Sequence, residues 1–227
     1  MPPTPWRVGG AQHQGHGEFQ ADAFAVSGDQ ATGRIAACVT DGLGDTLEAA
    51  EAAQLAAEAA ARATLTATPE AGCAAARERL AASDNMADAS IVTALFDPDQ
   101  SCVAITWAGI CRAYALTDDG HLTRATYDHS LGEHIRRRTT QGGPLTLYDR
   151  KATRTVARHE FVTTSLPIHT VRSVLLCSDG ISQNLADDVI LRALAEPDPD
   201  DAAQILVTAA GIHGPDNATA LVLHYQP

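Results

Sequence analysis

The sequence is poor in aromatic residues, has one lysine and lacks any long apolar run. Phe, Trp and Tyr make up only 4% of the 227 residues, so binding of nucleic-acid bases by stacking on aromatic side chains is disfavoured. No apolar stretch reaches the roughly 18 residues of a transmembrane helix. The first twenty residues lack the apolar centre of a signal peptide. Lys151 is the only lysine.

The five cysteines form no CxxC pair, and their number is odd. Together with the missing secretory signal, this spacing predicts reduced thiols and a cytoplasmic protein. The cysteines are Cys38, Cys73, Cys102, Cys111 and Cys177.

Acidic residues outnumber basic ones, with 28 Asp and Glu against 16 Lys and Arg and a formal net charge of −12. Such a charge repels phosphate backbones and anionic lipid, so we expect neither nucleic-acid nor membrane binding. An acidic protein that acts on an anionic substrate needs metal ions to offset its own field. The length and the apolar content of 45% predict a folded chain with one domain over residues 1–227.

Apolar runs separated by turn residues predict a mixed α and β protein. Strands recur in a hairpin-like order while the helices are grouped, which favours an α+β layered domain over a parallel βαβ sheet. Thr46 is a plausible N-cap for the first alanine-rich helix. A polar stretch over 128–144 is expected to form a short helix and a loop. The expected strands are 21–27, 34–39, 90–97, 101–109, 111–120, 173–179 and 218–225, and the expected helices are 46–67, 70–87, 187–194 and 200–210.

Four aspartates stand at the ends of these expected strands. Asp41 and Asp179 each follow an apolar strand and precede a glycine, Asp216 precedes the last strand, and Asp22 lies at the start of the first. Each alone is explained by a turn, because Asp-Gly pairs suit turns. If the four meet in space, their repulsion calls for a cation. Carboxylate oxygens favour Mg²⁺ or Mn²⁺ over Zn²⁺.

Seven short motifs follow one another along nearly the whole chain: FQADAF, VTDGLGD, ADASIVTALF, AGICRAYAL, DHS, LLCSDGI and PDNATALVL. Each motif is weak alone, but their order is specific. In this order they resemble the metal-dependent protein phosphatase family, the type 2C serine/threonine phosphatases, in a short bacterial-like form. The resemblance implies a four-layer α-β-β-α sandwich in which two antiparallel sheets are flanked by helix pairs.

The resemblance also implies a site and a reaction. Asp41 would bridge two Mn²⁺ or Mg²⁺ ions, Asp22, Asp179 and Asp216 would complete the cluster, and the Gly42 carbonyl would be a further ligand. A water activated between the two ions would release phosphate from a phosphoserine or phosphothreonine of a protein. The four aspartates are therefore the expected catalytic residues, the partner is a phosphorylated protein, and the role is in cytoplasmic signalling.

The chain departs from the family pattern at several positions. Gly17 stands where relatives carry a phosphate-binding Arg, and Ile110 stands where many carry an Asp that helps hold a third metal, so a third ion is doubtful here. His16, when protonated, could partly replace the arginine. His16 and Asn217 are thus the expected substrate-binding residues.

Leu43 fills a spacer that is His in some relatives. Protonation of the leaving group is then left to His129 or to water, and His129 could equally be a structural histidine of its turn. The cluster Arg136, Arg137 and Arg138 is explained either by a solvated helix face or by contact with a phosphorylated partner.

Two other functions stay open beside the protein phosphatase. The missing arginine and the missing aspartate favour a phosphatase-like binding module with little or no turnover. The space left at Gly17 also allows a phosphatase for a small phosphorylated molecule.

Overall fold

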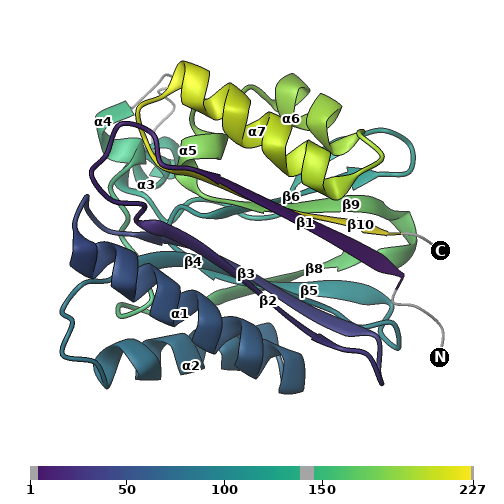
Figure 1. Ribbon diagram of the computed structural model, residues 1–227, viewed down its shortest axis with the longest axis horizontal. Coiled ribbons are helices and arrows are strands. Elements are labelled where there is room, and N and C mark those ends of the chain that lie inside the picture. Colours follow the sequence, from purple (N-terminus) through teal and green to yellow (C-terminus); the bar gives the residue numbers. More distant parts are fainter. Residues whose placement is uncertain (1–4, 139–145, 226–227) are drawn as a thin grey trace.

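Two antiparallel sheets pack face to face in the computed structural model, which describes residues 5–138 and 146–225 (Figure 1). Each sheet has five strands. The first sheet runs, in spatial order, β1 (Trp6–His13), β10 (Ala218–Tyr225), β9 (Val171–Cys177), β6 (Arg112–Thr117) and β7 (Leu122–Arg124). The second runs β2 (Asp22–Asp29), β3 (Arg34–Gly42), β4 (Ala89–Phe96), β5 (Cys102–Ala108) and β8 (Val162–Pro167).

Helices cover the outer face of each sheet, which confirms the expected α-β-β-α sandwich. Figure 1 shows α1 (Leu47–Thr66) and α2 (Pro69–Ala81) against the second sheet, and α6 (Asp187–Leu194) and α7 (Pro199–His213) against the first. Shorter elements complete the described part: α3 (Leu131–Arg138), α4 (Thr146–Asp149), a 3₁₀ turn η1 (Ile168–Thr170) and α5 (Asp179–Ser182). None of the helices within 5–138 and 146–225 is long and apolar enough to cross a membrane.

Alanine determines how closely α1 approaches the second sheet. The expected N-cap is confirmed, because the Thr46 side chain accepts a hydrogen bond from the Ala49 amide at 3.2 Å. Small side chains on one helix face allow the backbone of α1 to lie close to β2 and β3. The buried residues of this face are Ala49, Ala52, Ala53, Ala56, Ala57, Ala60, Ala61 and Thr64.

The second helix is shorter than expected, ending at Ala81 rather than near residue 87. Polar side chains compete there with the helical backbone. The Ser83 hydroxyl donates to the Leu80 carbonyl at 2.7 Å, and the side-chain amide of Asn85 donates to the backbone carbonyl of Glu48 at 2.7 Å. The chain after Ala81 is thereby held against the start of α1.

Strand β1 was not expected, because its sequence, WRVGGAQH, lacks an apolar run. Tertiary contacts hold it: β1 pairs along its whole length with β10. Trp6 enters the core between the sheets, where its ring centroid lies 4.6 Å from Phe96 and 5.0 Å from Tyr225. Edge strand β8 was also not expected, since it alternates exposed and partly buried residues.

Replacing Trp6 by alanine should lower the free energy of unfolding by about 3–5 kcal/mol, because a large buried ring is lost from the core. Urea unfolding followed by circular dichroism measures the change. Trp6→Phe is the control, and it should cost clearly less because an aromatic contact remains. Equal stability of Trp6→Ala and the wild type would contradict the placement of β1.

Candidate metal centre

Two of the four aspartates are cross-strand neighbours in the second sheet. Strands β2 and β3 are antiparallel, and their register pairs Asp22 with Asp41. Like charges directly opposite one another destabilise a sheet. The sheet therefore holds a strained carboxylate pair at the end where β2 begins and β3 finishes.

The other two aspartates lie at one end of the first sheet. Asp179 follows β9 and opens α5, and Asp216 precedes β10, the antiparallel neighbour of β9. The end of β9 and the start of β10 are joined by two hydrogen bonds, Ser178 N–H to the Thr219 carbonyl at 3.1 Å and Thr219 N–H to Ser178 Oγ at 3.0 Å. Asp179 and Asp216 thus lie at the adjacent ends of two neighbouring strands.

Polar side chains join the two sheets at this end. The side-chain amide of Gln12 donates to the backbone carbonyl of Asp22 at 3.0 Å and to Thr219 Oγ1 at 3.2 Å. Asn217 Oδ1 accepts from the Ala21 amide at 2.7 Å, and its Nδ2 donates to the Phe19 carbonyl at 3.1 Å and to the carbonyl of Gln14. These bonds hold both carboxylate pairs in one place.

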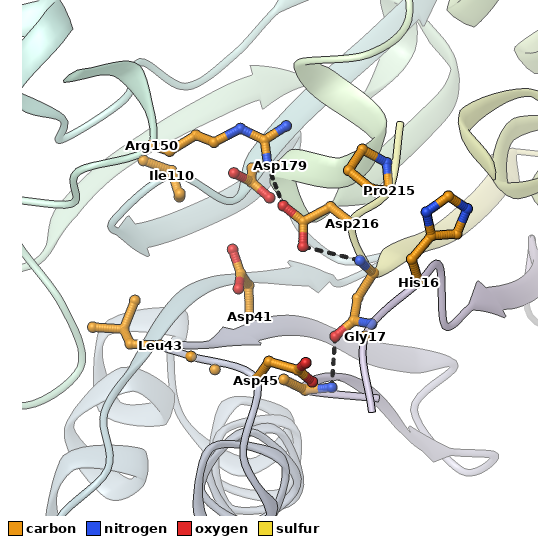
Figure 2. Close-up of a pocket in the computed structure, with 14 residues that line it drawn as sticks. His16, Gly17, Asp41, Leu43, Asp45, Ile110, Arg150, Asp179, Pro215 and Asp216 are labelled. Carbon is orange, nitrogen blue, oxygen red and sulfur yellow. Dashed lines mark hydrogen bonds and ion pairs between the residues drawn. The ribbon is translucent and has the colours of Figure 1, made fainter. Parts of the chain in front are cut away.

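The carboxylates of Asp41, Asp179 and Asp216 border a cavity of about 460 Å³. Figure 2 shows these three directed toward a common space, with Arg150 beside Asp179 and Asp216. Asp22, the cross-strand neighbour of Asp41, is not among the lining residues and is only 6% exposed. The residues lining the cavity are His16, Gly17, Ala21, Asp41, Gly42, Leu43, Gly44, Asp45, Ile110, Arg150, Asp179, Pro215, Asp216 and Asn217.

Burial and mutual repulsion raise the pKa values of these carboxyls. Burial raises the pKa of Asp22 to about 7, hydrogen bonds from Ser178 and Thr219 oppose the shift, and the charge of Asp179 adds to it. The pKa of Asp179 also rises to about 7, through burial and then the charge of Asp216. Burial, followed by Asp179 and Asp22, raises the pKa of Asp41 well above its usual range. These raised pKa values mean that nearby positive charge does not compensate for the negative charge of the carboxylates.

The donor set fits an oxygen-preferring divalent cation. In the arrangement described for 5–138 and 146–225, no three His, Cys, Asp or Glu side chains are placed to share one ion. Asp22 Oδ2, however, is buried with no hydrogen-bond partner, and a buried acceptor of this kind calls for a ligand. Carboxylates with no cysteine or histidine among them suit Mg²⁺ or Mn²⁺.

Gly42 has a steric role at this site. A Cβ there would lie 2.4 Å from the Ala49 carbonyl oxygen and 2.8 Å from that of Ala21. The Gly42 amide donates to the same Ala21 carbonyl at 2.9 Å. The glycine after Asp41 therefore allows the close packing of β3 on α1 and β2, whereas ligation by its carbonyl stays a prediction.

Asp45, whose role the sequence did not reveal, lies beside Gly17 and would have to move to admit a side chain at position 17. The Asp45 carboxylate accepts from the Glu18 amide at 3.0 Å and from the Phe19 amide at 2.9 Å. A Cβ at Gly17 would lie 2.9 Å from Asp45 Oδ1. The second acid of the VTDGLGD motif thus occupies the space beside Gly17.

The two expected substrate-binding residues both line the cavity. His16 is exposed, and its backbone amide donates to the Pro215 carbonyl at 2.8 Å. The side-chain amide of Asn217 is bonded to three backbone groups, as described above, so it holds the loop that precedes β2. Contact of either residue with a substrate stays a prediction.

His129 has the surroundings of a structural histidine. It is not among the cavity-lining residues, and its Nδ1 accepts from the Gly109 amide at 3.2 Å. Its ring stacks on Trp107 with centroids 5.7 Å apart. Burial, aided by Arg154 and Arg137, lowers the pKa of His129 to about 4. The residue is neutral at pH 7 and supports the turn that carries Ile110.

The DHS motif also anchors the helix that carries Asp179. Asp128 accepts from Arg112 Nε at 2.7 Å and Nη2 at 2.6 Å, a bidentate pair. Arg112 Nη1 donates to the Ser182 carbonyl of α5 at 2.9 Å. Arg112 therefore positions α5, which the sequence motifs alone did not show.

The raised pKa values predict how stability depends on pH in chelator. The folded chain holds protons on Asp22 and Asp179 up to about pH 7, whereas their ordinary pKa is 3.8. The stabilisation from these protons is complete below pH 3.8 and is lost as the pH rises through about 7. The melting temperature in chelator should therefore decrease as the pH is raised from 3.8 to about 7. The decrease should be less steep in Asp22→Asn.

Excess Mg²⁺ at about pH 8 should raise the wild-type melting temperature, because a cation that binds only the folded chain stabilises it. Differential scanning fluorimetry in chelator and in Mg²⁺ measures both effects. Equal pH slopes for the wild type and Asp22→Asn would contradict the proposed electrostatics.

Comparison with solved structures finds similar folds in bacterial serine/threonine phosphatases. The structure of PstP from Mycobacterium tuberculosis matches with a TM-score of 0.79 and 23% identity over 98% of this chain and 99% of that one. PppA of Pseudomonas aeruginosa, described as a key regulatory component of the T6SS, matches with a TM-score of 0.75 and 25% identity over 97% of each chain. Stp1 of Staphylococcus aureus matches with a TM-score of 0.83 and 18% identity over 99% and 97%.

A further structure of the PstP catalytic domain contains two manganese ions. No protein-family model matches the sequence, and a comparison with curated proteins finds no match. The likeness is therefore one of structure, and it extends over almost the whole of each chain. The protein has the fold of the bacterial PPM-type serine/threonine phosphatases.

Proposed function

We propose that this protein is a member of the metal-dependent phosphatase family that removes phosphate from phosphoserine or phosphothreonine in proteins. The observation that carries the proposal is the grouping of four aspartates, two from each sheet: Asp41, Asp179 and Asp216 line one cavity, and the buried Asp22 is the cross-strand neighbour of Asp41. Three of them have raised pKa values and one has a buried oxygen without a partner. The likeness to serine/threonine phosphatases, one of them with two manganese ions, supports the same conclusion.

Asp22, Asp41, Asp179 and Asp216, with the Gly42 carbonyl, would hold two Mg²⁺ or Mn²⁺ ions. Such a pair supplies positive charge and an activated water for in-line displacement at phosphorus. The protein residues around the aspartates orient them. Ser178 and Thr219 hydrogen bond to Asp22, and Arg112 fixes the helix that begins at Asp179. Outer contacts of this kind keep ligand oxygens in place.

A phosphatase-like binding module is the second candidate. Gly17 carries no cation, and Asp45 adds a negative charge to the cavity wall where a phosphate would enter. Both features oppose the binding of an anion. This candidate predicts metal binding without release of phosphate.

The direct test is phosphate release from a phosphothreonine peptide in Mn²⁺, Mg²⁺ or chelator. We expect release only with metal, and a loss of about a hundredfold or more in kcat/KM for Asp179→Asn, because several kcal/mol of charge stabilisation depend on the metal ligands. A malachite green assay measures the released phosphate. A small phosphate ester assayed in parallel separates the protein phosphatase from a small-molecule phosphatase.

Asp188→Asn is the matched control, since Asp188 lies on α6, is exposed and pairs with Arg192 at 2.8 Å. It should retain full activity. Metal-independent release, or full activity of Asp179→Asn, would overturn the proposal. Metal binding by the wild type with no release from any substrate would favour the binding module.

A further inference from the structure

An arginine from a part of the chain far from Gly17 in sequence lines the cavity. Among the lining residues in the part of the chain that the structure describes, Arg150 is the only Lys or Arg. Its guanidinium forms an ion pair with the Asp216 carboxylate, as Figure 2 shows. The Arg150 charge also acts on Asp41 and Asp179, lowering the pKa of each against the effects that raise it. Arg150 is thus paired with one carboxylate of the cluster, and its charge acts on two others.

Position 17, where relatives carry a phosphate-binding arginine, is occupied here by glycine. The Asp45 carboxylate lies beside Gly17 and accepts hydrogen bonds from the amides of residues 18 and 19. An arginine at position 17 would have to displace this carboxylate. A basic side chain that contacts a phosphate in this cavity beside the metal ions therefore has to come from another element.

Helix α3 and its neighbours hold Arg150 in place. The Leu131 amide donates to the Lys151 carbonyl at 3.0 Å, and Ser130 forms an antiparallel bridge with Ala152. Arg136 pairs with Asp149, the residue before Arg150, at 2.7 Å. The backbone on both sides of Arg150 is thus attached to α3 and to the DHS turn.

Two of the three arginines in the α3 cluster, Arg136 and Arg137, are engaged within the chain. Arg136 pairs with Glu133 as well as Asp149, and Arg137 pairs with Glu133 and lies 4.0 Å over the ring of Tyr127. The basic side chain directed at the cavity is Arg150, which is 40% exposed. Apart from Asp216, no hydrogen-bond partner of its guanidinium lies among the described residues.

We propose that Arg150 binds the phosphoryl group of the substrate and so replaces the arginine that is missing at position 17. This inference rests on the proposed function, because it concerns the same cavity. A guanidinium presents its N–H groups in a planar fork that matches two phosphate oxygens. Arg150 and a divalent cation also compete for the Asp216 carboxylate. Loss of Arg150 should therefore weaken phosphate binding while leaving metal binding equal or tighter.

Isothermal titration calorimetry tests both effects on the full chain. Mg²⁺ is titrated first into the metal-free protein, and inorganic phosphate is then titrated into the Mg²⁺-loaded protein. For Arg150→Ala we expect phosphate to bind about tenfold to a hundredfold more weakly, the range for a hydrogen bond to a charged group. The Mg²⁺ affinity should be equal or higher. Arg150→Lys should restore part of the phosphate affinity, since it keeps the charge without the fork.

Lys151→Ala is the matched control. It removes one positive charge from the next residue, whose ammonium lies 5.8 Å over the Tyr148 ring and does not line the cavity. Its phosphate affinity should match the wild type. An equal loss in Lys151→Ala would show a general charge effect and overturn the assignment of Arg150.

Two further outcomes would overturn the inference. Unchanged phosphate affinity in Arg150→Ala would show that the guanidinium does not touch phosphate. A loss of both Mg²⁺ and phosphate affinity would show that Arg150 only supports the fold of the site. If the wild type binds Mg²⁺ and phosphate through Arg150 yet releases no phosphate from a phosphopeptide, the proposed function fails and this inference stands.

Discussion

Repulsion among four carboxylates is the constraint on which this structure depends. Asp22 and Asp41 face each other across two strands, and Asp179 and Asp216 meet them from the other sheet. A chain of net charge −12 gains nothing for its stability from placing them together. Perturbed carboxyls of this kind commonly mark functional sites, and the proposed metal pair would offset their repulsion.

The sandwich explains how distant residues reach this site. Each sheet provides one pair of neighbouring strand ends, and packing the sheets face to face brings the two pairs together. Figure 1 shows the start of β1 and the end of β10 on the side of the sandwich opposite α3, α4 and α5. Hydrogen bonds of Gln12 and Asn217 fix one sheet against the other at the site. Strand register positions Asp22 and Asp41, and short segments directly attached to β9 and β10 position Asp179 and Asp216.

Much of this architecture could be predicted from the sequence, because apolar runs and the Asp-Gly steps mark buried strands and their ends. Strand β1 could not, since WRVGGAQH has no apolar period and is held by pairing with β10. Asp45 and Arg150 were missed for a related reason. The contact of Asp45 with the amides of residues 18 and 19, and that of Arg150 with Asp216, are tertiary and leave no local pattern.

The central claim is that the four aspartates form a centre for two divalent cations. The most direct test is calorimetric titration of Mn²⁺ into the metal-free protein, for the wild type and for Asp41→Asn. The wild type should bind two ions per chain, and Asp41→Asn should lose both or bind them far more weakly, because its carboxylate is expected to be shared. Absence of Mn²⁺ binding to the folded wild type, or two unchanged sites in Asp41→Asn, would contradict the account.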